Sequence, residues 1–399
     1  MGRMTPTIWL ALAGFVATAI SFGPARMGFG LFLPTFREAF DLDTTQAGFI
    51  ASLGFLAFLI ALPLAAWLGR RVGQRVPVVL GAMSASVGFA LVAVAQGSMG
   101  LTAGVTLAGA SAGFCWAPFN DAAERVVSPG VRPGTLSAIA TGTTVGVAVT
   151  GALYLGVTSG GIDWRFVWGM FAVLGLAGAL LAARGVPGGR VAKSAQTTDT
   201  RSFLRREAAP LHGAALCFGI SNAVYLAFAA DHVVASGGLD GLPEGGAAAM
   251  IFLSYGLCGL AGLATGRLEA WIGLVALVGV IFAAFTGSLV LVALWPGGWG
   301  SVLVSAGLHG AAVMMISAIL SFWSLRLFPG RGTLGFTAAL IGVAVGSVLG
   351  PAVMGALADV TGLKTALLAT AAVPLLAAIL FAIRVPRRAS HASITVGRM

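Results

Sequence analysis

One arginine lies deep inside an apolar stretch of this sequence and could bind an anion. Arg26 falls within the apolar run Thr7–Phe36. A charged side chain at the centre of a bilayer costs roughly 2.5–3.5 kcal/mol on insertion scales, so it needs a reason to be there. A guanidinium pairs with a carboxylate through two parallel hydrogen bonds, which makes an anionic solute one such reason. The other reason is structural: an ion pair or a bond to backbone carbonyls that fixes a bend at Gly23 and Pro24.

Further polar and aromatic side chains occur in other apolar runs. Asn222 occupies the place of Arg26 in a second, similar run, where an ordinary hydrogen bond between helices is the alternative role. The imidazole of His309 titrates near physiological pH and could carry a proton, although a neutral packing histidine fits equally well. Aromatic rings near them either pack in the core or line a substrate cavity. We predict a substrate site formed by Arg26, Phe29, Trp116, Asn222, Tyr225 and His309.

A charged cluster lies near the end of another apolar run. Asp121, Glu124 and Arg125 are close in sequence at the end of the run Met99–Glu124. They are either a solvated cluster at the membrane surface or a gate whose contacts break and reform. With two arginines of an earlier loop, the predicted gating set is Arg71, Arg75, Asp121, Glu124 and Arg125. The acidic residues of one later loop are expected to be simply solvated, together with their histidine: Asp231, His232, Asp240 and Glu244.

The elements that must position these residues are membrane-spanning helices. Hydrophobic residues make up 58% of the 399 residues, charged residues make up only 9%, and the mean hydropathy is +0.97. Soluble domains carry about a quarter charged residues, so a soluble fold of this size is excluded. A bilayer span needs about 20 mostly apolar residues. Runs of that length predict twelve helices, at Thr7–Phe36, Thr44–Gly69, Val76–Gln96, Met99–Glu124, Pro133–Thr158, Trp164–Ala183, Ala208–Val234, Glu244–Gly266, Ala270–Leu294, Gly300–Leu325, Gly332–Ala358 and Leu363–Ile383.

Several other classes of protein are excluded. The formal net charge of +10 would suit a nucleic-acid-binding protein, but the basic residues lie in short loops between apolar runs. The cysteines lie inside apolar runs, so neither a disulfide framework nor a metal site is expected. The histidines are scattered and no phosphate-binding Gly-rich motif occurs, so we expect no enzyme and no cofactor. The first apolar run continues past a signal-peptide-like Ala17-Thr18-Ala19, which indicates a retained helix.

The chain consists of two similar halves. Glycines and prolines recur at a constant offset, as in Gly151 and Gly350. Between the copies lies a basic stretch, rich in Gly, Ser and Thr, that cannot bury enough apolar surface to fold alone. We predict an all-α integral membrane protein of two pseudo-symmetric six-helix bundles, 1–184 and 208–399, joined by a cytoplasmic linker, 185–207. Small residues in both copies would let helices approach closely, namely Gly142, Gly146, Gly342 and Gly346.

The distribution of basic residues predicts the orientation. With the N-terminus inside the cell, nearly all of the 23 Lys and Arg residues fall on the cytoplasmic side, and Arg26 lies within a span. The exceptions outside are Arg37, Arg165 and Lys364. By the positive-inside rule both termini and the linker are cytoplasmic. We expect a monomer in the bacterial inner membrane.

Over essentially its whole length the chain resembles the major facilitator superfamily. The loop Ala66–Arg75 is similar to that family's Gly-x-Leu-x-Asp-Arg-x-Gly-Arg-Arg signature, with Ala66 and Arg70 replacing the first Gly and the Asp. In the fourth span, Val105 stands where many proton-coupled members carry an arginine. The run from Arg26 to Pro34 is similar to the YbfB/YjiJ-like branch of the superfamily.

The resemblance implies a transporter whose halves rock around a central site lined by the first, fourth, seventh and tenth helices. Arg26 and His309 would then face each other across the two halves. We predict a secondary active transporter of a small organic solute, with an organic anion favoured by Arg26 and proton coupling as a further option. The alternative is a multidrug-type efflux transporter with an apolar pocket. The absence of an acidic residue at the centre of any predicted span argues against that alternative.

Overall fold

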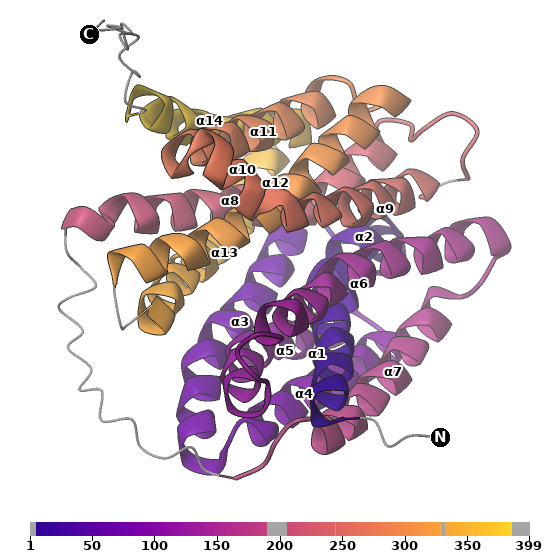
Figure 1. Ribbon diagram of the computed structural model, residues 1–399. Helices are drawn as coiled ribbons and strands as arrows, with labels where there is room; N and C mark the ends of the chain where they lie inside the picture. Colours follow the sequence, from indigo (N-terminus) through magenta and orange to yellow (C-terminus); the bar gives the residue numbers. More distant parts are fainter. Residues whose placement is uncertain (1–4, 190–205, 244, 329–331, 385–399) are drawn as a thin grey trace, which may run out of the picture.

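The computed structural model describes residues 5–189, 206–243, 245–328 and 332–384, which form helices joined by short connections (Figure 1). No strand occurs within these ranges. The α-helices are α1 (Pro6–Phe22), α2 (Pro24–Phe40), α3 (Thr44–Val72), α4 (Arg75–Ala93), α5 (Ser98–Val126), α6 (Arg132–Gly160), α7 (Trp164–Gly185), α8 (Ala209–Ala235), α9 (Gly246–Gly259), α10 (Thr265–Ile272), α11 (Leu274–Leu294), α12 (Trp299–Leu327), α13 (Gly332–Thr361) and α14 (Leu363–Arg384). Two short 3-10 helices are η2 (Arg206–Ala208) and η3 (Leu260–Ala264).

Within these described residues, 12 helical segments are long and apolar enough to cross a membrane. This confirms the predicted all-α fold with twelve spans. Two of the spans are composite, because α1 and α2 together form Pro6–Phe40, and α9, η3 and α10 together form Gly246–Ile272. Most of the predicted linker, residues 190–205, lies outside the described residues.

The first span is interrupted at the Gly23 and Pro24 pair. Gly23 has φ −75° and ψ −102°, and Pro24 begins α2. Proline lacks the N–H that would continue the helical ladder, so a break at this residue is expected. A Cβ added at Gly23 would lie 2.5 Å from the carbonyl oxygen of Ala19 and 2.6 Å from that of Gly146, so only glycine fits there. Because the helix is interrupted here, the direction of α2, which carries Arg26, is set separately from the direction of α1.

The chain folds as two groups of helices, α1–α7 and α8–α14, which occupy the lower and upper parts of Figure 1. We call these groups the N-half and the C-half. In each half the predicted small-residue helix packs closely on a neighbour. A Cβ added at Gly146 would lie 2.3 Å from the carbonyl oxygen of Ala19, and one at Gly346 would lie 2.4 Å from that of Leu216. The corresponding helix pairs, α6 with α1 and α13 with α8, are therefore held at close range in both halves.

The two halves approach most closely toward one end of the bundle. We call the end at which α1 begins the Pro6 face, and the opposite end, at which α2 gives way to α3, the Asp41 face. A Cβ added at Gly30 of α2 would lie 1.7 Å from the carbonyl oxygen of Leu226 in α8. One added at Gly48, near the start of α3, would lie 2.3 Å from the carbonyl oxygen of Pro351 in α13. Backbones of the two halves therefore touch near the Asp41 face.

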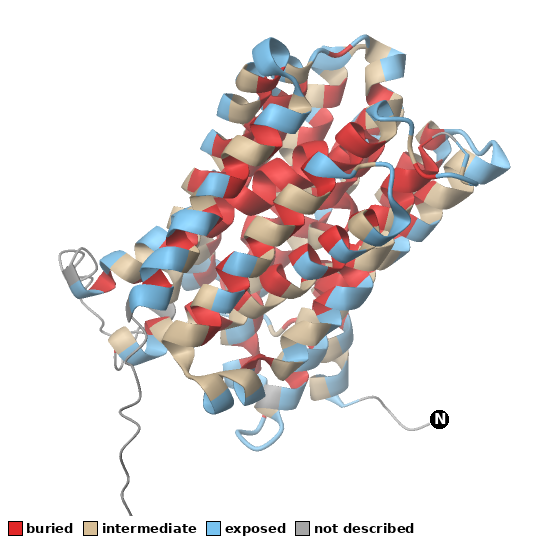
Figure 2. Cartoon of the chain, turned by 90° about the horizontal axis from the view of Figure 1, so that it is seen from above, coloured by how far each residue is buried: buried red, intermediate tan, exposed pale blue. Residues whose placement is uncertain are grey.

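Buried residues concentrate along the middle of the bundle, whereas exposed residues cover its outside and ends (Figure 2). Many of the exposed residues are large and apolar, such as Ile60, Phe166 and Val173. Water would not favour such a surface, but the hydrocarbon of a bilayer does. The outer surface is thus that of a multi-pass membrane protein.

Candidate functional site

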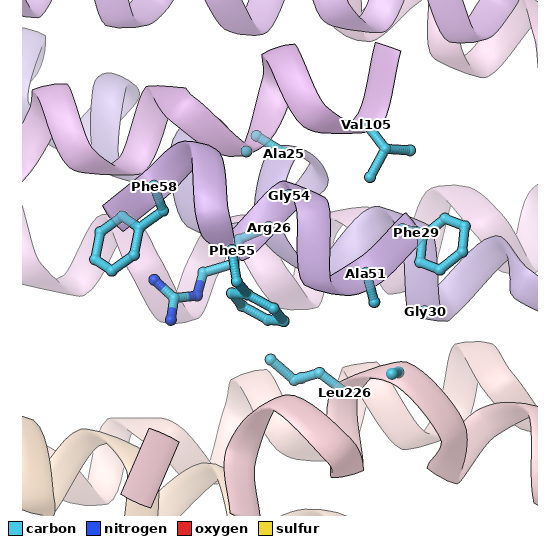
Figure 3. Close-up of a pocket in the computed structure, with 12 residues that line it drawn as sticks. Ala25, Arg26, Phe29, Gly30, Ala51, Gly54, Phe55, Phe58, Val105 and Leu226 are labelled. Atoms are coloured by element: carbon cyan, nitrogen blue, oxygen red, sulfur yellow. The ribbon is translucent and has the colours of Figure 1, made fainter. Parts of the chain in front are cut away.

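A cavity at Arg26 lies where the two halves meet. It contains about 420 Å³ of space between atoms, including the part open to solvent. Most of the lining comes from α2, α3 and α5 of the N-half, and the rest from α8 of the C-half (Figure 3). The lining residues are Ala25, Arg26, Phe29, Gly30, Ala51, Gly54, Phe55, Phe58, Val105, Gly109, Leu226 and Ala227. Arg26 is the charged member of this apolar lining.

The guanidinium of Arg26 is surrounded by aromatic rings. Its central carbon lies 4.6 Å from the ring centre of Phe58, 5.1 Å from that of Phe55 and 5.7 Å from that of Phe22. Figure 3 shows the guanidinium beside the Phe55 and Phe58 rings, with Leu226 across the gap on the other half. Cation–π contacts of this kind contribute about 0.5–2 kcal/mol each. Such contacts do not provide conventional hydrogen-bond acceptors for the N–H donors of the guanidinium.

Among the described residues, no carboxylate and no carbonyl bonds to the Arg26 guanidinium. The ion pair or carbonyl contact that was the structural alternative for Arg26 is therefore not formed within this part of the chain. Tyr255 of α9, in the C-half, lies within electrostatic range of the guanidinium. The donors of Arg26 thus remain available to a ligand that enters between the halves.

Two of the predicted aromatic residues lie close to this cavity. Phe29 lines it and stacks against Phe36 at 6.0 Å between ring centres. Trp116 of α5 lines a second, smaller cavity in the N-half and meets Phe22 edge-to-face at 5.4 Å. Phe22 also contacts Arg26, so the Phe22 ring lies between Trp116 and the guanidinium.

The predicted residues of the C-half form a cluster of their own. Tyr225 stacks on His309 at 3.8 Å between ring centres, and the tyrosine hydroxyl lies 3.1 Å from Ser305 Oγ. Ser288 Oγ lies 2.9 Å from His309 Nδ1, and the Tyr255 hydroxyl donates to Asn222 Oδ1 at 3.2 Å. These residues are buried, and none of them lines the cavity at Arg26.

His309 is enclosed within this cluster and does not face Arg26. It is fully buried, and Phe285 meets its ring edge-to-face at 4.8 Å. Its Nε2 atom has no hydrogen-bond partner within the described part of the chain. A buried ring nitrogen without a partner is unusual, because such groups are normally satisfied. The structure therefore brings Asn222, Tyr225 and His309 together in the C-half, and none of the three lines the cavity that Arg26 and Phe29 line.

Several residues around Arg26 and around His309 were not predicted from the sequence. Phe55 and Phe58 stand three positions apart, so they share one face of α3, but this spacing is equally typical of core packing. Tyr255, Ser288 and Ser305 carry no signal beyond being polar residues in apolar runs. Only the packing of α9, α11 and α12 around α8 reveals their connection.

The predicted gating residues bond within the N-half. Asp121 accepts a hydrogen bond from Gln74 Nε2 at 2.9 Å, and Arg75 Nε donates to the carbonyl of Val186 at 2.8 Å. Arg125 donates to the carbonyl of Gly189 at 3.2 Å. These contacts tie the α3–α4 turn and the end of α5 to the segment that follows α7.

The other two gating candidates take part in that region differently. The guanidinium of Arg71 lies over the Trp67 ring at 4.9 Å. Glu124 is exposed, and its backbone carbonyl accepts a hydrogen bond from Arg132 at 3.1 Å. The turn itself packs tightly, because Gly73 has φ +90° and a Cβ there would lie 2.3 Å from the carbonyl oxygen of Gly189. Both the positive φ and the close approach require glycine.

Removing the Asp121 carboxylate is expected to slow transport without changing ligand affinity. Asp121→Ala cuts the bond from Gln74 that holds the α3–α4 turn to α5, so the N-half would move less as one rigid body. We expect turnover to fall by about two- to tenfold, which corresponds to the roughly 0.5–1.5 kcal/mol of one hydrogen bond. Glu207→Ala, at an exposed carboxylate of η2 outside the predicted gating set, is the matched control. A changed affinity with an unchanged rate would contradict this role.

Comparison with known proteins gives the same architecture. The family model described as Major Facilitator Superfamily matches residues 10–321. No curated protein matches the sequence. A crystal structure of a variant of the nucleoside transporter NupG is 12% identical, with a TM-score of 0.76, and the match covers 95% of this chain and 99% of that one. An inward-facing, occupied structure of a bacterial homolog of the human lysosomal transporter Spinster is 17% identical, with a TM-score of 0.70, and the match covers 96% and 97% of the two chains. At such identities these structures show a shared fold.

Proposed function

The chain belongs to the Major Facilitator Superfamily, and we propose that this secondary transporter carries a small organic anion bound by Arg26. The observation that supports the proposal is the guanidinium itself. It lies in a cavity between the halves, held over aromatic rings, with no acidic partner among the described residues. A cation in an apolar site is costly unless it is paired, so a carboxylate that enters the cavity would remove that cost.

The lining suggests that the anion has an apolar body. Phe55, Phe58, Val105 and Leu226 offer carbon surface and no hydrogen-bonding side-chain groups. A small carboxylate with an aliphatic or aromatic part would place its charge on Arg26 and its body against these side chains. Val105, which the family resemblance puts where many proton-coupled members carry an arginine, also lines the cavity. In this proposal Arg26 supplies the positive charge from a different helix.

The same apolar lining favours a second candidate, a multidrug-type transporter. Such a protein would accept apolar cations or neutral compounds, and NupG is described as a transporter of nucleosides, which are neutral. The positive charge of Arg26 should repel cations in this cavity. A thermal-shift screen of the purified protein against carboxylates, nucleosides and cationic drugs separates these candidates. A specific ligand at 100 times its Kd stabilises the folded protein by about 2.7 kcal/mol. We expect carboxylates to do so, whereas stabilisation by cationic drugs alone would favour the multidrug candidate.

We also propose that a proton accompanies the anion and that His309 binds it. The imidazole is buried in the C-half, and Ser288 holds one ring nitrogen while the other has no partner among the described residues. A histidine can gain and lose a proton near physiological pH. His309 is linked to Tyr225 by stacking, and Tyr225 is adjacent to Leu226 of the cavity wall. The two sites are therefore connected through α8, and a shift of this helix at Tyr225 would also move Leu226 in the cavity wall.

Replacing His309 by glutamine should uncouple transport from the pH gradient. Glutamine keeps hydrogen-bonding capacity but does not titrate, so accumulation driven by a pH gradient should fall by at least about tenfold. Exchange of labelled for unlabelled anion needs no net proton movement and should continue. Both are measured in proteoliposomes, with His212→Gln as the control. Gradient-driven accumulation at the normal level in His309→Gln would exclude His309 as the proton carrier.

Orientation, location and organisation are further parts of the proposal. The positive-inside distribution of Lys and Arg supports an inner-membrane protein with both termini in the cytoplasm, which makes the Pro6 face cytoplasmic. The two helix groups support a division into bundles at 1–184 and 208–399 with a linker at 185–207. We propose that one chain is the transporting unit, because the cavity at Arg26 is formed within a single chain.

A further inference from the structure

A partly buried ion pair joins the two halves at the Asp41 face. Arg37 Nε of α2 lies 2.9 Å and 3.0 Å from the two carboxylate oxygens of Asp231 in α8. The other guanidinium nitrogens donate to the Leu42 carbonyl at 2.7 Å and to Thr44 Oγ1 at 2.9 Å. Arg37 thus connects Asp231 to the turn Asp41–Asp43. The Asp231 side chain is only 5% exposed, so the expectation that it is solvated was wrong.

A second carboxylate of the C-half accepts hydrogen bonds from the first backbone N–H groups of α3. The first backbone N–H groups of a helix have no partner within the helix. Asp359, near the end of α13, accepts the N–H of Thr44 at 3.1 Å and that of Thr45 at 2.8 Å, and it also accepts the Thr45 hydroxyl. The next N–H, of Gln46, donates to Asp43 at 2.6 Å, and Gln46 bonds back to the Asp43 backbone in a capping box. α3 therefore keeps a cap of its own when Asp359 is absent.

These contacts are the hydrogen bonds that join described residues of the two halves, and all of them lie at the Asp41 face. Beneath them the helices touch through glycines. A Cβ added at Gly355 of α13 would lie 2.8 Å from the Thr44 carbonyl oxygen and 3.2 Å from Gly48 Cα. The start of α3 cannot separate from α13 unless the bonds to Asp359 break, and the turn cannot leave α8 unless Arg37 and Asp231 part.

We propose that Asp231 and Asp359 form a latch on the α2–α3 turn, which holds the Asp41 face closed and releases whenever that face opens. Both carboxylates belong to the C-half, and both sets of donors belong to one turn of the N-half. Because the capping box stays with α3, release exposes two N–H groups to solvent without unwinding the helix. The latch concerns the movement of the halves and does not depend on which solute is carried.

The distance between the latched helices tests this proposal without a ligand. Spin labels at Phe49→Cys on α3 and Val360→Cys on α13 would sit at exposed positions, 58% and 85% accessible, outside the latch itself. The labels require replacement of Cys115, Cys217 and Cys258 in the purified full-length protein. We expect a short distance between the labels to dominate in lipid. Asp359→Ala should raise the long-distance population by about three- to tenfold, because Asp359 is exposed and its bonds are individually weak.

Two further variants make the result decisive. Asp359→Asn keeps one acceptor oxygen and should lie between the unmodified protein and Asp359→Ala. Arg37→Gln removes the ion pair from its more exposed partner and should also raise the long-distance population. The matched control is Asp163→Ala, because Asp163 caps α7 at the same face through the Arg165 N–H at 2.8 Å without reaching the C-half. The latch is refuted if Asp359→Ala and Arg37→Gln both give the distribution of the unmodified protein.

Discussion

Replacing Arg26 by alanine is expected to abolish binding of the anion. A carboxylate on a guanidinium forms two charge-assisted hydrogen bonds, each contributing about 1.5–3 kcal/mol. Their loss should weaken the affinity by at least about 100-fold, since 1.4 kcal/mol is a factor of ten. Arg26→Lys keeps the charge but not the two-bond geometry, so its loss should be smaller, about tenfold. The affinities are measured by calorimetry on the purified variants.

The control for this experiment is an arginine that also contacts an aromatic ring. Arg165 lies 4.2 Å over the Trp164 ring and donates to the carbonyl of Ala95 at 3.0 Å, away from the cavity. Arg165→Ala should therefore leave the affinity unchanged. A folded Arg26→Ala protein that binds the anion normally would show that Arg26 has only a structural role.

Replacing Gly30 by alanine is expected to impair closure of the Asp41 face. The added Cβ would lie 1.7 Å from the carbonyl oxygen of Leu226, well inside contact distance, and the obstacle is backbone, not a flexible side chain. Overpacking of this kind typically costs about 1–3 kcal/mol. The two halves can relieve it by staying apart at this face, so each half should remain folded while the initial rate of uptake falls by at least about tenfold.

A glycine elsewhere in the N-half provides the comparison. Gly169 of α7 has nothing within 4 Å of an added Cβ, so Gly169→Ala should transport at the normal rate. Both variants are first compared by thermal unfolding and then by uptake in proteoliposomes. Normal uptake by Gly30→Ala would mean that α2 and α8 do not need to come as close as they do in this structure.

Much of the fold could be predicted from the sequence because a bilayer constrains it strongly. Length and hydropathy alone indicate the spans, and the Gly23 and Pro24 pair marks the break in the first span. The first helix pair nevertheless runs to Phe40, beyond the expected end at Phe36, and Arg37 of its last turn pairs with Asp231 of the C-half. End positions depend on such tertiary contacts, which periodicity does not report.

The site could be predicted only in part because depth in the membrane does not give the direction of a side chain. Arg26 and His309 were expected to face each other, since counting residues puts them at similar depth. The structure turns His309 into the C-half against Tyr225. A change of one residue rotates the side chain by about 100° around a helix, and only packing between helices fixes that angle.

Asp231 shows the same limit for contacts that are distant in sequence. It stands beside His232 and near other acidic residues, a pattern typical of a solvated loop. Its partner, Arg37, is in the other half of the chain, and nothing in either local sequence connects them. Only the approach of α2 to α8 reveals that Asp231 is paired and buried.

Uptake of a radiolabelled carboxylate into proteoliposomes tests the central claim most directly. The compound is the carboxylate that stabilises the purified protein most in the thermal-shift screen. Vesicles with the unmodified protein should take it up at a rate that saturates with its concentration, and vesicles with Arg26→Ala should match empty vesicles. Uptake of a cationic drug or a nucleoside by the unmodified protein, with no carboxylate uptake above that of empty vesicles, would contradict the account.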